Sequence, residues 1–135
     1  MIVLDSSAAC DMVRKTEEGM AFRALMLSEE KVISCELLRA EVVSIFRKLC
    51  RHGLIPIEKV QSFLTESTAL VNEYYSIQEL QEEVLSESIR LDHSSYDMFY
   101  FVLARRFGAT LFTLDRKLIR LCEEQGVQCV AILEN

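Results

Sequence analysis

The chain begins Met1-Ile-Val-Leu-Asp-Ser-Ser, a short apolar run that ends in a carboxylate and two hydroxyls. A run of this length suits a buried strand, and Asp followed by Ser-Ser is a typical start of a helix. The stretch Ala109-Thr-Leu-Phe-Thr-Leu-Asp has the same order, with Asp115 closing the apolar run. Two strand-to-helix turns that each carry an aspartate indicate an α/β fold with polar chemistry at the strand ends.

The rest of the chain alternates between strands and helices in the same way. Strands are expected near residues 2–4, 31–34, 72–76, 110–113 and 127–130. Helices are expected near residues 5–14, 17–27, 36–51, 56–70, 78–91, 95–106 and 115–124. Strands separated by helices pair in parallel through right-handed crossovers. The prediction is a single three-layer α/β/α domain over residues 1–135, with a central, mainly parallel sheet of four to five strands.

The composition is that of a folded domain. Half of the residues are hydrophobic and Pro56 is the one proline, which argues against disorder. The longest apolar run, residues 98–104, is far shorter than a membrane span. The first residues have neither the basic start nor the long apolar stretch of a signal peptide, so a cytoplasmic location is expected.

Several kinds of functional site find no support in the sequence. Five cysteines are scattered without the spacing of a zinc site, and they are expected to be small buried hydrophobes. His52 and His93 have no Cys–His context and are expected at the surface or at helix ends. The glycines are dispersed, so neither a dinucleotide-binding fingerprint nor a P-loop is present. No GxSxG nucleophile turn occurs either.

The charge distribution matters more than the net charge of −6. The segment between Lys59 and Arg90 holds six glutamates and no Lys or Arg, and it is expected to be an exposed helix face away from any substrate. Basic residues gather elsewhere, in clusters at 14–15, 47–51, 105–106 and 116–120. Phosphate contacts need local Lys and Arg rather than a high overall charge. Such clusters are often only solvated faces. The candidates for RNA phosphate contacts are Arg14, Arg47, Arg116 and Lys117.

Four carboxylates lie within apolar sequence: Asp5, Glu41, Asp97 and Asp115. Burying an ionised carboxylate is costly unless it is paired or bound to a cation. If the strands before Asp5 and Asp115 are neighbours, these two side chains share one cleft. Four converging carboxylates would suit a divalent metal ion, and a metal held by oxygen suits phosphate chemistry.

Each carboxylate also has a purely structural interpretation. Asp5 and Asp115 can cap the helices that follow them, and capping does not exclude metal binding. Glu41 lies inside the apolar arc of its helix, where it could be ion-paired or extend its carboxylate to solvent. Asp97 could accept hydrogen bonds from amides of the first turn, behind a cap at Ser94 or Ser95. Four such residues in one small domain favour a shared role.

Taken together, these motifs resemble PIN-domain ribonucleases, most closely the VapC-type toxins of bacterial and archaeal toxin–antitoxin pairs. The resemblance covers essentially the whole chain and is carried by the order and spacing of four segments. These are Ile2-Val-Leu-Asp-Ser-Ser, Glu36-Leu-Leu-Arg-Ala-Glu-Val-Val-Ser-Ile-Phe-Arg, Ser95-Tyr-Asp-Met-Phe-Tyr-Phe-Val-Leu-Ala and Thr113-Leu-Asp-Arg-Lys-Leu.

The resemblance implies a function and a site. Asp5, Glu41, Asp97 and Asp115 would be the acidic quartet that binds Mg²⁺ or Mn²⁺ and cleaves RNA, leaving 3′-hydroxyl and 5′-phosphate ends. Thr113 would be the hydroxyl that supports the site, and Ser6 would be a partner of the acids. The resemblance also implies a homodimer and a cognate antitoxin protein that covers the acidic cleft.

The sequence departs from the family pattern at two positions. The family often has an Asn three residues after its Glu, where this chain has Ser44, and Glu36 is an extra acid that could compete as a ligand. Three other functions stay open: a PIN-like module that binds RNA or protein without cleavage, a PIN ribonuclease of RNA processing, and a receiver-like phosphoacceptor domain. A receiver needs paired acids after its first strand and a Lys near its last, and neither is present.

Overall fold

The computed structural model describes residues 1–26, 29–130 and 132. Within these residues the chain forms one five-stranded sheet in the order β3-β2-β1-β4-β5, and all four pairings between neighbouring strands are parallel. The strands are β1 (Ile2–Leu4), β2 (Val32–Cys35), β3 (Glu73–Tyr75), β4 (Thr110–Phe112) and β5 (Cys129–Val130). The expected parallel α/β sheet is confirmed, with five strands.

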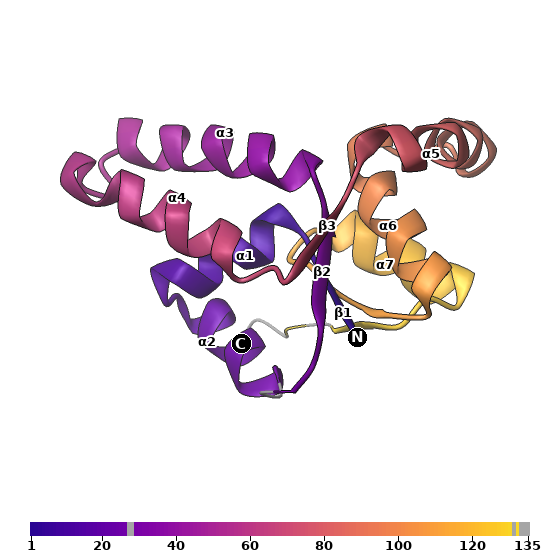
Figure 1. Ribbon diagram of the computed structural model, residues 1–135, viewed down its shortest axis with the longest axis horizontal. Coiled ribbons are helices and arrows are strands. Elements are labelled where there is room, and N and C mark those ends of the chain that lie inside the picture. The colour runs from indigo at the N-terminus through magenta and orange to yellow at the C-terminus, as the bar shows by residue number, and fades with distance from the viewer. Residues whose placement is uncertain (27–28, 131, 133–135) are drawn as a thin grey trace.

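Helices cover both faces of this sheet (Figure 1). One layer holds α1 (Ser6–Arg14), α2 (Glu17–Leu25), α3 (Leu37–Arg51) and α4 (Val60–Ala69). The other layer holds α5 (Ile77–Leu91), α6 (Ser95–Phe107) and α7 (Arg116–Gln125). In Figure 1, α3 and α4 extend together from the sheet as an antiparallel pair, whereas α5 to α7 pack on the opposite side. The three-layer α/β/α architecture is therefore confirmed.

The order of the strands determines where a crevice opens at the edge of the sheet. Successive crossovers lead from β1 outward to β3 on one side, and β4 returns to the other side of β1. A parallel sheet opens a crevice beyond the carboxyl ends of its strands where the order reverses in this way. Leu4 pairs with Phe112, and the Asp5 amide donates a hydrogen bond to the Phe112 carbonyl at 3.2 Å. The turns after β1 and β4 consequently lie side by side.

Helix α6 anchors the core. All residues from Met98 to Ala104 are buried, as the apolar sequence predicts, and the helix packs against β1, β2 and β4. Its buried surface fixes the helix axis against the sheet, since packed interiors allow little displacement. Asp97 precedes this buried segment directly, so its position at the sheet edge is set by the packing of α6.

Several boundaries differ from the expected ones by a residue or two. Pro56 does not lie inside a helix; it precedes a short 3₁₀ turn (Ile57–Lys59) that leads into α4. Such tighter turns are common at helix starts. The last strand is shorter than expected because only Cys129 and Val130 pair with β4. Leu27, the expected end of the second helix, lies outside the described residues.

The expected exposed acidic face is present only in part. Two glutamates of α5 are exposed, as expected, whereas Glu83 and Glu87 are half-buried and pair with the basic cluster of α6. Arg105 contacts Glu83 at 2.8 Å and Glu87 at 3.0 Å, and Arg106 contacts Glu83 at 2.9 Å. The cluster at 105–106 thus holds α5 against α6, a contact between elements that charge spacing within one segment does not reveal.

A search of the described helices finds none that is both long enough and apolar enough to cross a bilayer.

Candidate active site

Asp5 occupies the turn between β1 and α1. Its carboxylate accepts hydrogen bonds from the Ala8 amide at 2.9 Å and the Ser7 hydroxyl at 2.7 Å, so it does cap α1. Only 4% of the residue's surface is exposed. The same buried carboxylate can cap α1 and still face the edge of the sheet, because the strand-to-helix turn directs it outward from the end of β1.

Burial has the largest effect on the pKa of Asp5. It raises the pKa of the Asp5 carboxyl from 3.8 to about 7, although hydrogen bonds from Ala8, Thr113 and Ser7 act to lower it. The charge of Glu41 raises this pKa further. A buried carboxylate whose hydrogen-bond donors do not offset its burial gains from a nearby cation.

Glu41 lies on the face of α3 that meets α1 and α6. Ser6 donates a hydrogen bond to Glu41 Oε1 at 3.2 Å, and the Tyr100 hydroxyl donates a short hydrogen bond to the same oxygen. Among the described residues no base lies within ion-pair distance of this carboxylate. The ion-paired interpretation therefore does not apply, and two hydroxyls orient the side chain instead.

Asp97 lies in the first turn of α6. Its Oδ2 is 3.3 Å from His93 Nε2. Burial and the neighbouring charge of Asp115 raise the pKa of Asp97 from 3.8 to about 6, although His93 acts to lower it. Ser94 provides no side-chain cap, and within the described chain Asp97 accepts no hydrogen bond from a first-turn amide. The capping interpretation of Asp97 is not supported.

Asp115 begins α7 and is a true helix cap. Its Oδ1 accepts hydrogen bonds from the amides of Lys117 at 2.9 Å and Leu118 at 3.2 Å. The side chain of Thr113 is fully buried. Its Oγ1 accepts a hydrogen bond from the Asp115 amide at 3.0 Å, and the same hydroxyl forms a hydrogen bond with the Asp5 carboxylate. Thr113 thereby links the two strand-end aspartates.

The four carboxylates come from four elements and act on one another electrostatically. Glu41 raises the pKa of both Asp5 and Asp97, and Asp115 raises that of Asp97. As they stand, however, no three potential ligands in the described part of the chain lie close enough to hold one ion. The donor set fits a divalent cation by its chemistry, since its members are oxygens without a Lys or Arg partner. Closing on an ion would require side-chain rotation.

Three polar residues contact the acids, and the sequence did not predict these contacts. The Ser7 hydroxyl accepts a hydrogen bond from the Leu114 amide at 3.0 Å and donates one to the Asp5 carboxylate. It thereby links the turn after β1 to the turn after β4. Tyr100 could have been found, because it lies one turn after Asp97 on the same helix face. His93 does lie at a helix end, as expected, but its side chain is only 12% exposed and it contacts Asp97.

The other acid and bases considered from the sequence lie in different surroundings. Glu36 forms an ion pair with Arg39 at 2.8 Å and does not join the four carboxylates. Arg14 ends α1, at the opposite end of the helix from Asp5, and lies 3.8 Å from Asp11 with its buried Nε unbonded. Arg14 is thus not beside the four carboxylates, and its contact with RNA stays a prediction.

The remaining candidates for phosphate contacts are exposed. Arg47 lies on α3, in an apolar hollow shared with α4. Arg116 and Lys117 form the first turn of α7, directly after Asp115. The turn after β4 therefore brings two bases next to the acidic edge.

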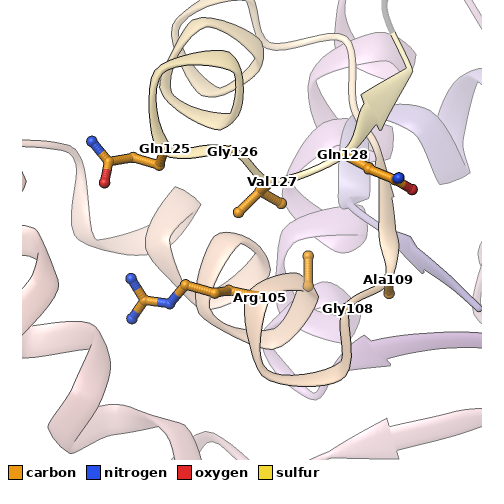
Figure 2. Close-up of a pocket in the computed structure, with 8 residues that line it drawn as sticks. Arg105, Gly108, Ala109, Gln125, Gly126, Val127 and Gln128 are labelled. Carbon is orange, nitrogen blue, oxygen red and sulfur yellow. The ribbon is translucent and has the colours of Figure 1, made fainter.

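A groove continues from this edge along α3. It has a volume of about 410 Å³ and is bordered by residues of α1, α3 and α6, among them Ser6 and Glu41. A second hollow of about 260 Å³ lies where the ends of α6 and α7 meet, near the amino ends of β4 and β5. Figure 2 shows Val127 pointing toward α6 there, while Arg105 and Gln125 extend outward. Its one charged lining residue, Arg105, is already paired, so the acidic edge is the better candidate for chemistry.

Comparisons with known proteins agree with this fold. The model of the PIN domain family matches residues 2–124. Ribonuclease VapC3 of Pyrobaculum aerophilum is 24% identical over 119 residues, which are 87% of this chain and 91% of that protein.

Two solved structures share the fold. PAE2754 from Pyrobaculum aerophilum superposes with a TM-score of 0.69 at 20% identity, over 88% of this chain and 84% of that one. Mycobacterium tuberculosis VapC20, described as a sarcin–ricin loop cleaving toxin, superposes with a TM-score of 0.63 at 17% identity, over 90% and 95%. Since the family model spans nearly the whole chain, this protein belongs to the PIN domain family.

Proposed function

We propose that this protein is a Mg²⁺- or Mn²⁺-dependent endoribonuclease that hydrolyses RNA phosphodiesters. The observation that carries the proposal is the group of four carboxylates at the switch point of the sheet. None of them has a Lys or Arg partner among the described residues, and burial raises the pKa of Asp5 to about 7 and, together with the charge of Asp115, that of Asp97 to about 6. Membership of the PIN domain family and similarity to Ribonuclease VapC3 support the same activity.

The residues that would hold the cation are Asp5, Glu41, Asp97 and Asp115. A bound divalent ion would supply a more acidic water and a positive charge beside the phosphate. Ser6 and Tyr100 fix the orientation of Glu41, and Thr113 and Ser7 fix that of Asp5. Such partners restrict the ligands to few rotamers.

The chain also offers a group for proton transfer. Hydrolysis needs a group that orients the attacking water or accepts its proton, and a carboxylate of the acidic edge can do either. Asp97 Oδ2 lies 3.3 Å from His93 Nε2, and this contact restrains the carboxylate. In the proposed reaction Asp97 helps to take a proton from the attacking water, and His93 positions its carboxylate. The products would carry 3′-hydroxyl and 5′-phosphate ends.

The cellular role that fits best is that of a toxin in a toxin–antitoxin pair. Two relatives support it by name: one is called a VapC ribonuclease and the other is described as a toxin. The proposal includes a cytoplasmic RNA substrate, a cognate antitoxin protein and a homodimer. Co-purification of the neighbouring gene product tests the antitoxin, and sedimentation of the purified protein tests the homodimer.

Cleavage of total cellular RNA by the purified protein tests the activity. Reactions contain Mg²⁺, Mn²⁺ or EDTA, with Asp97→Asn protein in parallel. Discrete fragments that require both metal and Asp97 are expected. Folded, partner-free protein that leaves every RNA intact would favour the non-catalytic binding module, and cleavage at the same rate in EDTA would refute the metal dependence.

A further inference from the structure

We propose that the groove along α3 binds one unpaired nucleotide of the RNA next to the scissile phosphate, with Tyr96 stacking on its base and Lys48 contacting a phosphate. The inference rests on the proposed function and adds to it a binding subsite for the substrate. We call this the α3 groove; its lining residues are Ser6, Leu37, Ala40, Glu41, Ser44, Ile45, Lys48 and Tyr96.

The α3 groove is continuous with the acidic edge. Ser6 and Glu41, which are hydrogen-bonded to each other, belong both to the candidate active site and to the wall of the groove. Tyr96 lines the groove and immediately precedes Asp97 in the first turn of α6. A substrate held at the carboxylates would therefore have its next unit directed into this groove.

Tyr96 is unusual among the aromatic residues of this protein. It is 62% exposed, whereas Tyr100, one turn later on the same helix, is buried. The ring of Tyr96 stacks on no other aromatic ring in the described part of the chain and offers a flat apolar surface at the rim of the groove. Stacking of a base on such a ring contributes roughly 1–3 kcal/mol and tolerates any base, because every base has a π-face.

Lys48 provides the opposite charge that a phosphate needs. It lies seven residues after Glu41 on the same face of α3, about 10 Å farther along the helix. No acid lies within ion-pair distance of Lys48 in the described residues, in contrast to Arg105 and Arg106, which are paired with glutamates. In a chain with a net charge of −6, an exposed Lys beside the acidic edge is a favourable place for an anion.

The floor of the groove suits a nucleotide. Ala40 and Ser44 are small, and Leu37 and Ile45 are half-buried apolar residues that can face a sugar or base. The volume of about 410 Å³ falls within the roughly 300–1,000 Å³ of small-ligand pockets. An acid, two serine hydroxyls and a base lie among the apolar residues, and this combination matches the mixed polar and apolar surface of a nucleotide.

Equilibrium binding in EDTA separates this subsite from catalysis. The probe is a fluorescent single-stranded RNA of about 12 nucleotides, within the size range of single-strand sites. Tyr96→Ala is expected to weaken binding by roughly 5- to 150-fold, and Tyr96→Phe to leave it unchanged, because the ring is retained. Lys48→Ala should weaken binding and reduce the salt dependence by about one phosphate contact. Ile89→Ala and Lys59→Ala, which change exposed residues outside the groove, serve as matched controls.

An abasic scan tests the stacking itself. Removing one base at a time should weaken binding to wild-type protein at one position, and that loss should vanish in Tyr96→Ala protein. Such non-additivity marks a direct contact. Equal losses in both proteins at every position, or unchanged binding in Tyr96→Ala and Lys48→Ala, would overturn the subsite and leave the groove to a protein segment.

The cleavage assay tells the two proposals apart. If wild-type protein cleaves RNA and Tyr96→Ala matches its KM, the subsite is refuted while the nuclease stands. If wild-type protein binds RNA through Tyr96 but never cleaves it with metal, the nuclease is refuted while the subsite stands. A raised KM with little change in kcat for Tyr96→Ala supports both.

Discussion

Two groups of carboxylates in this protein differ in their surroundings, and their pKa values shift in opposite directions. Between α5 and α6, Glu83 and Glu87 lie against Arg105 and Arg106, and hydrogen bonds from Arg90 and Arg105 lower the pKa of Glu87 to about 2. At the carboxyl edge of the sheet, burial raises the pKa of Asp5 to about 7. The first group is satisfied by the chain itself, whereas the second is held by hydroxyls and amides and gains from a cation that the chain does not provide.

Under the proposed function, this difference separates a structural role of the first group from a functional role of the second. Carboxylates paired with arginines stabilise the contact between two helices and gain nothing from a metal ion. Carboxylates buried without a base destabilise the metal-free fold, and such strain is found where a site is prepared for a ligand. The following predictions distinguish the two groups, beginning with the largest effect.

Asp97→Asn should abolish RNA cleavage while the fold persists. The substitution removes the charge at the acidic edge but keeps the shape of the side chain. We expect kcat/KM to fall by at least about 100-fold. Substituting a residue that only supports a metal ligand typically lowers activity by about 10- to 100-fold, so the loss of a ligand should reach or exceed that range. Circular dichroism checks the fold and gel-based cleavage checks the activity. Turnover at the wild-type rate would remove Asp97 from the site.

Asp5→Asn should stabilise the metal-free protein above neutral pH. The folded pKa of about 7 lies above the unfolded value of 3.8, so the folded state binds more protons between these values. Stability consequently falls as pH rises through this window, by up to about 4 kcal/mol at full ionisation. The Asn variant lacks this loss and can still cap α1.

Urea unfolding in EDTA at pH 4 and pH 8 measures this effect. The gain of Asp5→Asn over wild type should be present at pH 8 and small at pH 4. Mg²⁺ should stabilise the wild type more than the variant, since the metal compensates the ionised carboxylate. A variant less stable than the wild type at pH 8 would contradict the unpaired state of Asp5.

Tyr100→Phe should lower activity by about 10-fold, through the orientation of Glu41. The hydroxyl donates to Glu41 Oε1, and its loss leaves the carboxylate free to rotate. Tyr74→Phe is the matched control, because Tyr74 also loses one hydrogen bond, to the Thr68 carbonyl at 2.6 Å, away from the acidic edge. Equal cleavage by the two variants would show that Tyr100 serves stability alone.

Glu87→Gln should have the smallest effect on cleavage and an effect on stability opposite in sign to that of Asp5→Asn. The folded pKa of Glu87 is about 2, below its ordinary 4.5, so its contribution is present above pH 4.5 and is lost as pH falls toward 2. The variant should lose some stability at pH 8 with unchanged cleavage. A clear loss of cleavage would mean that the paired group also takes part in function.

Local features explain how much of this could be predicted from the sequence. Asp5 and Asp115 follow short apolar runs, and parallel pairing of β1 with β4 then brings them to one edge. The helical phase of Glu41 predicts that it faces inward, as it does. These inferences need only periodicity and the rule for strand ends.

Contacts between distant elements could not be predicted in the same way. Tyr100 and Glu41 are separated by 59 residues and meet only because α6 packs against the sheet. The pairing of Arg105 with Glu83 and Glu87 depends on the relative rotation of α5 and α6, which charge counting along the chain does not reveal. The sequence therefore shows the basic cluster at 105–106 but not the glutamates that pair with it.

Anomalous diffraction from crystals grown with Mn²⁺ tests the central claim most directly. The account predicts a peak among the carboxylates of Asp5, Glu41, Asp97 and Asp115, and none beside Glu83 and Glu87. A peak only at the paired glutamates, or none at the acidic edge of a protein that cleaves RNA in the same buffer, would contradict it.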